Sequence, residues 1–107
     1  MRLKELLKGV PLVGGTWKDD TEITGISCDT RTMRPGDLFA ALPGYKADGQ
    51  DFIPQALERG AAAVLCRKAP AFPGPWLVAE DPRAAMALLS ANWFGHPAMA
   101  RPPRPIF

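Results

Sequence analysis

The sequence contains no Gly-Lys dipeptide and no two glycines spaced as G-x-G. The P-loop and the dinucleotide-binding glycine motif need these patterns, so neither common glycine loop for ATP is encoded. Histidine occurs once and the two cysteines lie far apart, which leaves no metal-ligand spacing. Residues 25–29 resemble a nucleophile elbow for three positions and then lack its second glycine. The sequence therefore predicts neither catalytic nor metal-binding residues in this chain.

An excess of one charge and long apolar runs are also missing. There are 13 Lys and Arg against 11 Asp and Glu, and the net charge of +2 comes from Arg101 and Arg104. This balance predicts no nucleic-acid partner. No apolar run reaches the roughly 18 residues of a membrane span, and charges interrupt the opening residues where a signal peptide needs an apolar core. We expect no membrane partner and a cytoplasmic location.

The sequence does contain the pattern of a small α/β domain. Its 107 residues, 47% of them apolar, suit one domain. Strand-like runs alternate with helical periodicity, which predicts a mixed or parallel sheet of about four to five strands flanked by helices. Strands are expected over 23–28, 38–42, 61–66 and 76–79, with a loop or weak edge strand over 11–20. We expect this domain to occupy residues 1–96, followed by a Pro-rich linker or tail over 97–107.

Three helices are predicted from apolar spacing and capping residues. The first contains Leu3, Leu6 and Leu7, with Gly9 after it. The second has Asp51 as its N-cap and ends at Gly60, with an apolar face made of Phe52, Ile53, Ala56 and Leu57. The third begins at Asp81-Pro82 and ends at Gly95, with a face made of Ala85, Leu88, Leu89, Asn92 and Trp93. Cys28 and Cys66 lie in apolar strand-like runs, so reduced, buried thiols are favoured over a disulfide.

Polar loops follow the first two firm strands, where ligands commonly bind in open α/β sheets. In the first loop, Thr30 offers a hydroxyl and an amide to a phosphate, and Arg31 offers a cation. In the second, Lys46 offers a cation and Tyr45 an aromatic face for a base. The residues expected to support these loops are Asp29, Gly44, Asp48 and Gly49, with a positive φ at Gly44 or Gly49.

The same residues also fit a purely structural interpretation. Asp29 and Thr30 are typical caps of a turn, and Arg31 could pair with Asp37 or Asp48. Tyr45 and Lys46 would then be solvated. From the residues alone both interpretations stay open.

Three stretches resemble the N-terminal domain of the Mur ligases of bacterial cell-wall synthesis. They are MRLKELL, the block GISCDTRTMRPGDLFAALPGYKADGQDFIPQALERGAAAVL, and LLSANWFGHPAMAR, which together span about residues 1–101. The ending Trp93-Phe94-Gly95-His96-Pro97 is similar to that of the ligases that add the third peptide residue. The resemblance therefore implies a domain that binds UDP-N-acetylmuramoyl-L-alanyl-D-glutamate.

The resemblance also implies specific contacts. The uridine-diphosphate contacts of the family carry over to Cys28, Thr30, Tyr45, Lys46 and Ala47. Thr30 replaces the usual serine, and Tyr45-Lys46 stands where other polar residues can occur. In the family, ATP and Mg²⁺ bind to a central domain, and the incoming amino acid binds to a third domain. Both are missing from this sequence, so we expect the chain alone to be inactive.

Two other functions remain open. The ligase of the same family that adds the D-Ala-D-Ala dipeptide shares the central block of motifs. Alternatively, the Pro/Arg segment from Arg101 to Pro105 could bind an aromatic groove, which would make the chain a non-catalytic interaction module.

Overall fold

The computed structural model describes residues 1–43 and 49–95. The helices are α1 (Leu3–Leu6), the 3-10 helix η1 (Gly49–Phe52), α2 (Ile53–Glu58) and α3 (Pro82–Phe94). The strands are β1 (Gly14–Thr16), β2 (Gly25–Ser27), β3 (Asp37–Ala40), β4 (Ala63–Cys66) and β5 (Trp76–Val78). The predicted linker over 97–107 lies outside the described residues.

The strands form one sheet in the order β1-β5-β4-β3-β2. The neighbours from β2 to β5 are parallel, and β1 pairs antiparallel with β5 at the sheet edge. The predicted mixed sheet is confirmed, and its edge strand lies within residues 11–20 as expected. Because β2 and β3 are parallel neighbours, the loops that follow them leave the sheet at the same edge.

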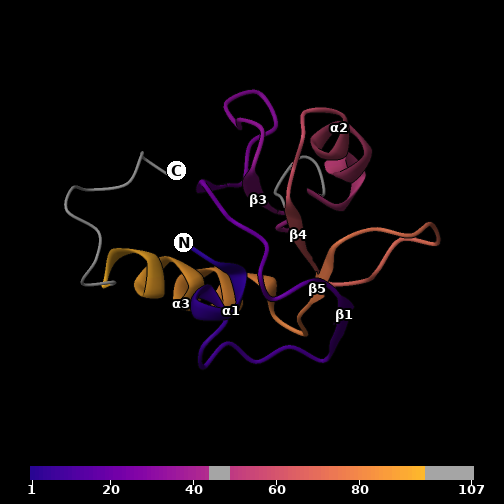
Figure 1. The fold of residues 1–107 in the computed structure, drawn as a ribbon. Helices are drawn as coiled ribbons and strands as arrows, with labels where there is room; N and C mark the ends of the chain where they lie inside the picture. The colour runs from indigo at the N-terminus through magenta and orange to yellow at the C-terminus, as the bar shows by residue number, and fades with distance from the viewer. Residues whose placement is uncertain (44–48, 96–107) are drawn as a thin grey trace.

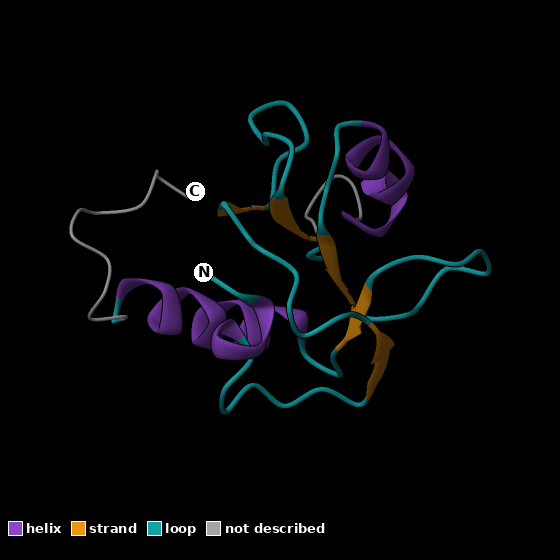
Figure 2. Cartoon of the chain, in the orientation of Figure 1, coloured by secondary structure: helices purple, strands orange, loops and turns teal. Residues whose placement is uncertain are grey.

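Helices cover both faces of this sheet (Figures 1 and 2). In β3, Leu38 and Ala40 pack in the cluster that contains α1 and α3 residues, whereas Phe39 packs in the cluster that contains α2 residues. This alternation follows from the pleat of a strand, which sends successive side chains to opposite faces. The α1 segment is also fixed to α3, because the Asn92 side chain donates to the carbonyls of Leu6 and Lys8 at 2.7 and 2.8 Å.

The predicted start of α3 is confirmed, since the Asp81 carboxylate accepts the Ala84 N–H at 3.2 Å. Its buried face differs from the prediction. Leu88 is 41% exposed, and Pro82 and Met86 are buried along with Ala85, Leu89 and Trp93. Gly95 stands at the C-cap with a φ of −83°, so the helix ends there without a left-handed residue.

The start of α2 differs from the prediction as well. Asp51 is not the N-cap, because it lies inside η1, and the N-cap of α2 is Phe52, which makes no side-chain capping bond. The chain thus enters α2 through a 3-10 turn. Phe52 is 39% exposed instead of joining the core face, whereas Ile53 and Ala56 are buried as expected. Gly60 ends the helix with a φ of +91°, as predicted.

The described residues on either side of segment 44–48 are bonded to each other. The Gly49 N–H donates to the Leu42 carbonyl at 2.8 Å, which joins the chain on either side of the segment. Gly49 does not have the predicted positive φ. Glycine is needed there for another reason, since a Cβ would lie 2.6 Å from the Leu42 backbone nitrogen and oxygen. Gly44 lies outside the described residues.

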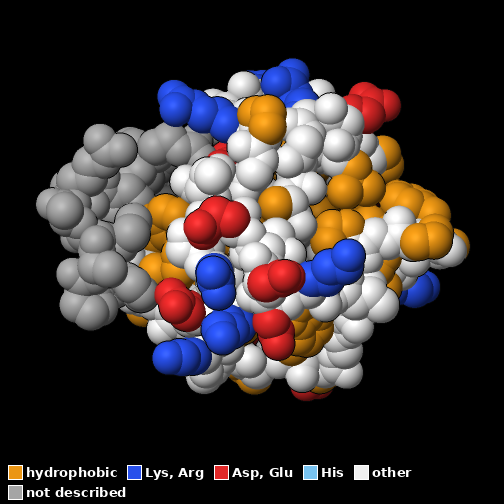
Figure 3. Space-filling model, viewed as in Figure 1, with side chains coloured by type: hydrophobic (Ala, Val, Ile, Leu, Met, Phe, Trp, Pro, Cys, Tyr) orange, Lys and Arg blue, Asp and Glu red, His pale blue; other side chains and the backbone are white. Residues whose placement is uncertain are grey.

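The surface carries both signs of charge. On the face shown in Figure 3, Lys and Arg side chains are interspersed with Asp and Glu. Within the described residues, no helix combines the length and the apolar character needed to cross a bilayer.

Candidate functional site

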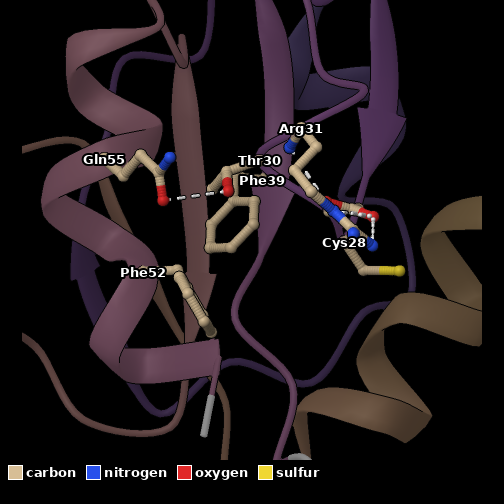
Figure 4. Close-up of a pocket in the computed structure, with 7 residues that line it drawn as sticks. Cys28, Thr30, Arg31, Phe39, Phe52 and Gln55 are labelled. Carbon is tan, nitrogen blue, oxygen red and sulfur yellow. Dashed lines mark hydrogen bonds and ion pairs between the residues drawn. The ribbon is translucent and has the colours of Figure 1, made fainter. Parts of the chain in front are cut away.

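A cavity of about 570 Å³ lies between the turn that follows β2 and the segment formed by η1 and α2 (Figure 4). Phe39 of β3 stands between these two sides. The residues described around it are Cys28, Asp29, Thr30, Arg31, Phe39, Phe52 and Gln55. The structure therefore brings the predicted Asp29-Thr30-Arg31 loop to a cavity, at the carboxyl end of a parallel strand as expected.

The turn after β2 is built by Asp29. Its carboxylate accepts the backbone N–H of Arg31 at 2.8 Å, and its carbonyl accepts the N–H groups of Thr32 and Met33 at 3.2 and 3.1 Å. The Ser27 hydroxyl also donates to the Asp29 carbonyl at 3.0 Å. The predicted capping role of Asp29 is confirmed, and it fixes the direction in which the next two side chains leave the turn.

Arg31 pairs with Asp29 in a two-pronged arrangement, with its NH2 nitrogen 2.9 Å from the carboxylate. The suggested pairing with Asp37 is wrong, because Asp37 is fully buried and accepts from the Thr24 hydroxyl and the Arg34 N–H. The Arg31 side chain bonded to Asp29 lowers the pKa of that carboxyl, with help from the Arg31 amide. The Arg31 side chain is 84% exposed, so its guanidinium stands beside the cavity as one half of an exposed ion pair.

Thr30 is buried, and its hydroxyl donates to the side-chain oxygen Oε1 of Gln55 at 3.2 Å. Gln55 and Phe52 line the cavity from the side opposite Arg31 (Figure 4). Neither residue was predicted as part of the site. Their spacing of three residues, directly after the second polar loop, was the available signal, since it places both on one side of a helical turn.

The two cysteines are free, and their environments differ. Cys66 is buried as predicted, and burial raises its pKa to about 11. Cys28 is only partly buried, which corrects the prediction of two buried thiols, because it stands just past β2 at the cavity. Burial, followed by the charge of Asp29, raises the pKa of Cys28, and the nearby charge of Arg83 opposes the rise. Both thiols are protonated near neutral pH, which disfavours nucleophilic chemistry.

Arg83 was not predicted near the site. Its guanidinium donates to the carbonyl of Pro43, the residue that precedes segment 44–48. The first turn of α3 is thereby bonded to the last described residue before that segment. The predicted contacts Tyr45, Lys46 and Ala47, together with Gly44 and Asp48, lie in segment 44–48 and so outside the described residues.

The described residues do not fit Mg²⁺-ATP. Within residues 1–43 and 49–95, no three His, Cys, Asp or Glu side chains gather as a metal site. The sequence has no glycine loop with the lysine that would contact nucleotide phosphates. The polar groups at the cavity are instead the Gln55 amide and the Arg31 guanidinium, which is ion-paired with the Asp29 carboxylate. A guanidinium carries five N–H donors, so this one can bond an anion as well.

Comparison with known proteins gives consistent matches. A family model described as "Mur ligase family, catalytic domain" matches residues 22–93. The UDP-N-acetylmuramoyl-L-alanyl-D-glutamate–2,6-diaminopimelate ligase of Streptomyces coelicolor is 53% identical over 81 residues, covering 71% of this chain and 16% of that protein. The ligase of the same name from Mesorhizobium japonicum is 46% identical over 98 residues, covering 89% of this chain and 20% of that protein. A crystal structure of MurF from Acinetobacter baumannii matches with a TM-score of 0.72 and 28% identity, over 91% of this chain and 22% of that one.

Proposed function

Because the chain belongs to the Mur ligase family and has the fold of its N-terminal domain, we propose that it binds the uridine-diphosphate part of UDP-N-acetylmuramoyl-L-alanyl-D-glutamate. The observation that supports this most is the cavity between Arg31 and Phe52. Its volume of about 570 Å³ suits a small-molecule ligand. It offers a cation at one end and an aromatic side chain at the other, as a nucleotide requires.

We assign the diphosphate to the Arg31 side of the cavity. The Asp29 turn holds this guanidinium at the rim in an ion pair, and the Arg31 side chain is 84% exposed, so an anion can approach it without a large desolvation cost. Tyr45, Lys46 and Ala47 of the second loop are proposed as further contacts of the uridine diphosphate. Gln50 and Arg83 bond the carbonyls of Lys68 and Pro43, which ties the flanks of that loop to the rest of the domain.

The activity proposed for the whole protein is ligation of the third peptide residue. The chain spans between 16% and 20% of the two curated relatives described above. ATP, Mg²⁺ and the acceptor amino acid would therefore be bound by a central and a C-terminal domain outside this sequence. The chain alone would bind substrate without turnover, and the complete ligase would work in the cytoplasm. We also propose that residues 97–107 are the linker toward the central domain.

A ligase that adds D-Ala-D-Ala is the second candidate, favoured by the structural match to MurF. That match is 28% identical, against 46% and 53% for the diaminopimelate ligases. Both candidates share the uridine-diphosphate site and differ in the peptide that they accept. Titration with UDP-N-acetylmuramoyl dipeptide and tripeptide would separate them, since the third-residue ligase should prefer the dipeptide.

The proposal is tested by NMR titration of the chain with UDP and with uridine. UDP should bind in the high micromolar to millimolar range, because one domain supplies only part of the ligand's surroundings. Amide shifts should be confined to residues 28–31, 45–48 and the cavity wall of α2. No shifts at several millimolar UDP would overturn the proposal.

Arg31→Gln tests the phosphate assignment. It should weaken UDP binding about three- to tenfold and leave uridine binding unchanged, because uridine lacks the anion that the guanidinium contacts. Arg34→Gln is the matched control, since Arg34 is exposed but does not line the cavity. Equal losses for UDP and uridine in Arg31→Gln would assign Arg31 to shaping the turn instead.

A further inference from the structure

The first turn of α3 adjoins the carboxyl ends of β2 and β3. Cys28, which follows β2, and Leu42, which follows β3, both pack against the core cluster that contains Ala85 and Met86 of α3. Figure 4 shows the Cys28 side chain pointing away from the η1–α2 side of the cavity. The charge of Arg83 acts on this thiol, where it opposes the rise of the pKa. The start of α3 is therefore a third element beside the two strand ends after which ligand contacts are proposed.

Arg83 extends from a fixed part of this helix. The Asp81 carboxylate accepts the Ala84 N–H at 3.2 Å, and Pro82, whose ring restricts its φ, is buried. Arg83 itself is exposed. The place of its side chain therefore depends on this fixed backbone and on the partner of its guanidinium.

That partner is the carbonyl of Pro43, 40 positions earlier in the chain. The carbonyl one residue before it, that of Leu42, has a main-chain partner, because it accepts the Gly49 N–H at 2.8 Å. Pro43 has no N–H, so its carbonyl is the only hydrogen-bonding group of its backbone. The orientation of this peptide group therefore depends on a side chain of α3.

We propose that Arg83 is a positioning residue for uridine-diphosphate binding, a proposal that rests on the proposed function. By fixing Pro43, it sets the point from which the chain continues to the contacts proposed over 45–47. When only a fraction of molecules has the binding arrangement, every ligand of that arrangement binds more weakly by the same fraction. Arg83 thus acts through Pro43 on the whole nucleotide, whereas Arg31 acts on the diphosphate alone.

The test compares UDP and uridine in NMR titrations of the wild-type chain and of Arg83→Met. Methionine keeps an apolar stem and removes both the donor and the charge. It should weaken both ligands about three- to tenfold and by the same factor, so the ratio of their affinities should not change. Arg83→Lys should stay within about twofold of the wild type, because an ammonium can donate to the same carbonyl.

Asn92→Ala is the matched control. Asn92 is another α3 side chain that donates to backbone carbonyls, in this case those of Leu6 and Lys8. Its replacement should lower the urea midpoint and leave the affinity for UDP unchanged. If Arg83→Met gives this same pattern, the bond to Pro43 only stabilises the fold and the proposal is overturned.

Two other outcomes would also overturn the positioning role. A loss for UDP with unchanged uridine binding in Arg83→Met would mean that the guanidinium contacts the diphosphate directly. If Arg83→Lys binds both ligands as weakly as Arg83→Met, a donor at this position is not what the site needs.

Failure of this proposal differs from failure of the proposed function. If the wild-type chain binds UDP and Arg83→Met binds it equally well, the uridine-diphosphate site stands and the role of Arg83 is wrong. If the wild-type chain does not bind UDP at all, both are overturned.

Discussion

Two adjoining turns connect β2 to β3, and each is organised by one aspartate. In the turn from Asp29 to Met33, the Asp29 carboxylate accepts the Arg31 N–H at 2.8 Å. In the turn from Arg34 to Asp37, the Asp37 carboxylate accepts the Arg34 N–H at 2.9 Å. Asp29 stands at the cavity beside an exposed arginine, whereas Asp37 is fully buried. The same local interaction thus holds an exposed ion pair at a cavity in one turn, whereas in the other it involves a buried carboxylate that also accepts from Thr24.

The largest difference between the two turns should appear on replacing each aspartate with asparagine. In Asp37→Asn, one carboxylate oxygen becomes an NH₂ group facing either the Thr24 hydroxyl or the Arg34 N–H. We expect a loss of about 2–3 kcal/mol in the free energy of unfolding, because a fully buried side chain then no longer accepts one of its two hydrogen bonds. Asp29→Asn should cost less than about 1 kcal/mol, since its ion pair is exposed. Urea unfolding of both variants measures this, and equal losses would contradict the comparison.

The second turn also depends on a glycine, which the first turn does not contain. Gly36 has a φ of +90°, and a Cβ there would lie 2.8 Å from the Thr24 hydroxyl oxygen. Gly36→Ala should therefore cost about 1–2 kcal/mol in the free energy of unfolding. Gly14→Ala is the control, because Gly14 has no positive φ and nothing lies within 4 Å of its added Cβ. Similar urea midpoints for the two variants would show that the turn tolerates a side chain.

The smallest effect should be the pH dependence that comes from the first turn. The Arg31 side chain holds the pKa of Asp29 below its ordinary value of 3.8. A lowered folded-state pKa gives stability that is present above 3.8 and is lost as the pH falls through the folded-state pKa. Asp29→Asn should therefore flatten the fall in stability below that pH, as followed by urea unfolding across the acid range.

Glu22 provides the control for this measurement. The terminal ammonium of Met1 bonds the Glu22 carboxylate and lowers the pKa of Glu22 below 4.5. Glu22 therefore also contributes stability that is lost as the pH falls. Glu22→Gln should remove only the Glu22 contribution to the pH dependence of the free energy of unfolding. Asp29→Asn in the same background should then flatten the remaining pH dependence. An acid slope that does not change in Asp29→Asn would mean that the pair with Arg31 makes no net contribution to stability.

The four parallel strands were predictable because each lies in a short apolar run, whereas β1, which reads Gly-Gly-Thr, was predictable only as a weak edge strand. The start of α3 was equally predictable from Asp81-Pro82, where the cap and the ring conformation both favour a helix. Apolar spacing failed where a helix begins irregularly. Phe52 fits the core face of an ideal helix, but η1 precedes α2 and leaves this ring partly exposed at the cavity.

Half of the candidate site followed from local sequence, and half did not. The Asp29-Thr30-Arg31 triplet is typical of a turn, and the Asp29 carboxylate bonds Arg31, two residues later. The spacing along the chain was therefore sufficient to predict this turn. The bond between Thr30 and Gln55 joins residues 25 positions apart and depends on how α2 packs against the sheet. The partner of Arg31 was assigned to a distant carboxylate, although the nearest one, two residues earlier, is already fixed by the turn.

The bond from Asn92 to the Leu6 carbonyl spans 86 positions of the chain. During synthesis at roughly 5–20 residues per second, Leu6 therefore waits about 4–17 s before Asn92 has even been polymerised. For most of that interval, the apolar side of α1 has no α3 to cover it, and β1 has no β5 to pair with. The domain can close only once most of its chain is available, so on the ribosome it should fold late and in one step, and nascent chains that stop before Asn92 should present α1 to chaperones.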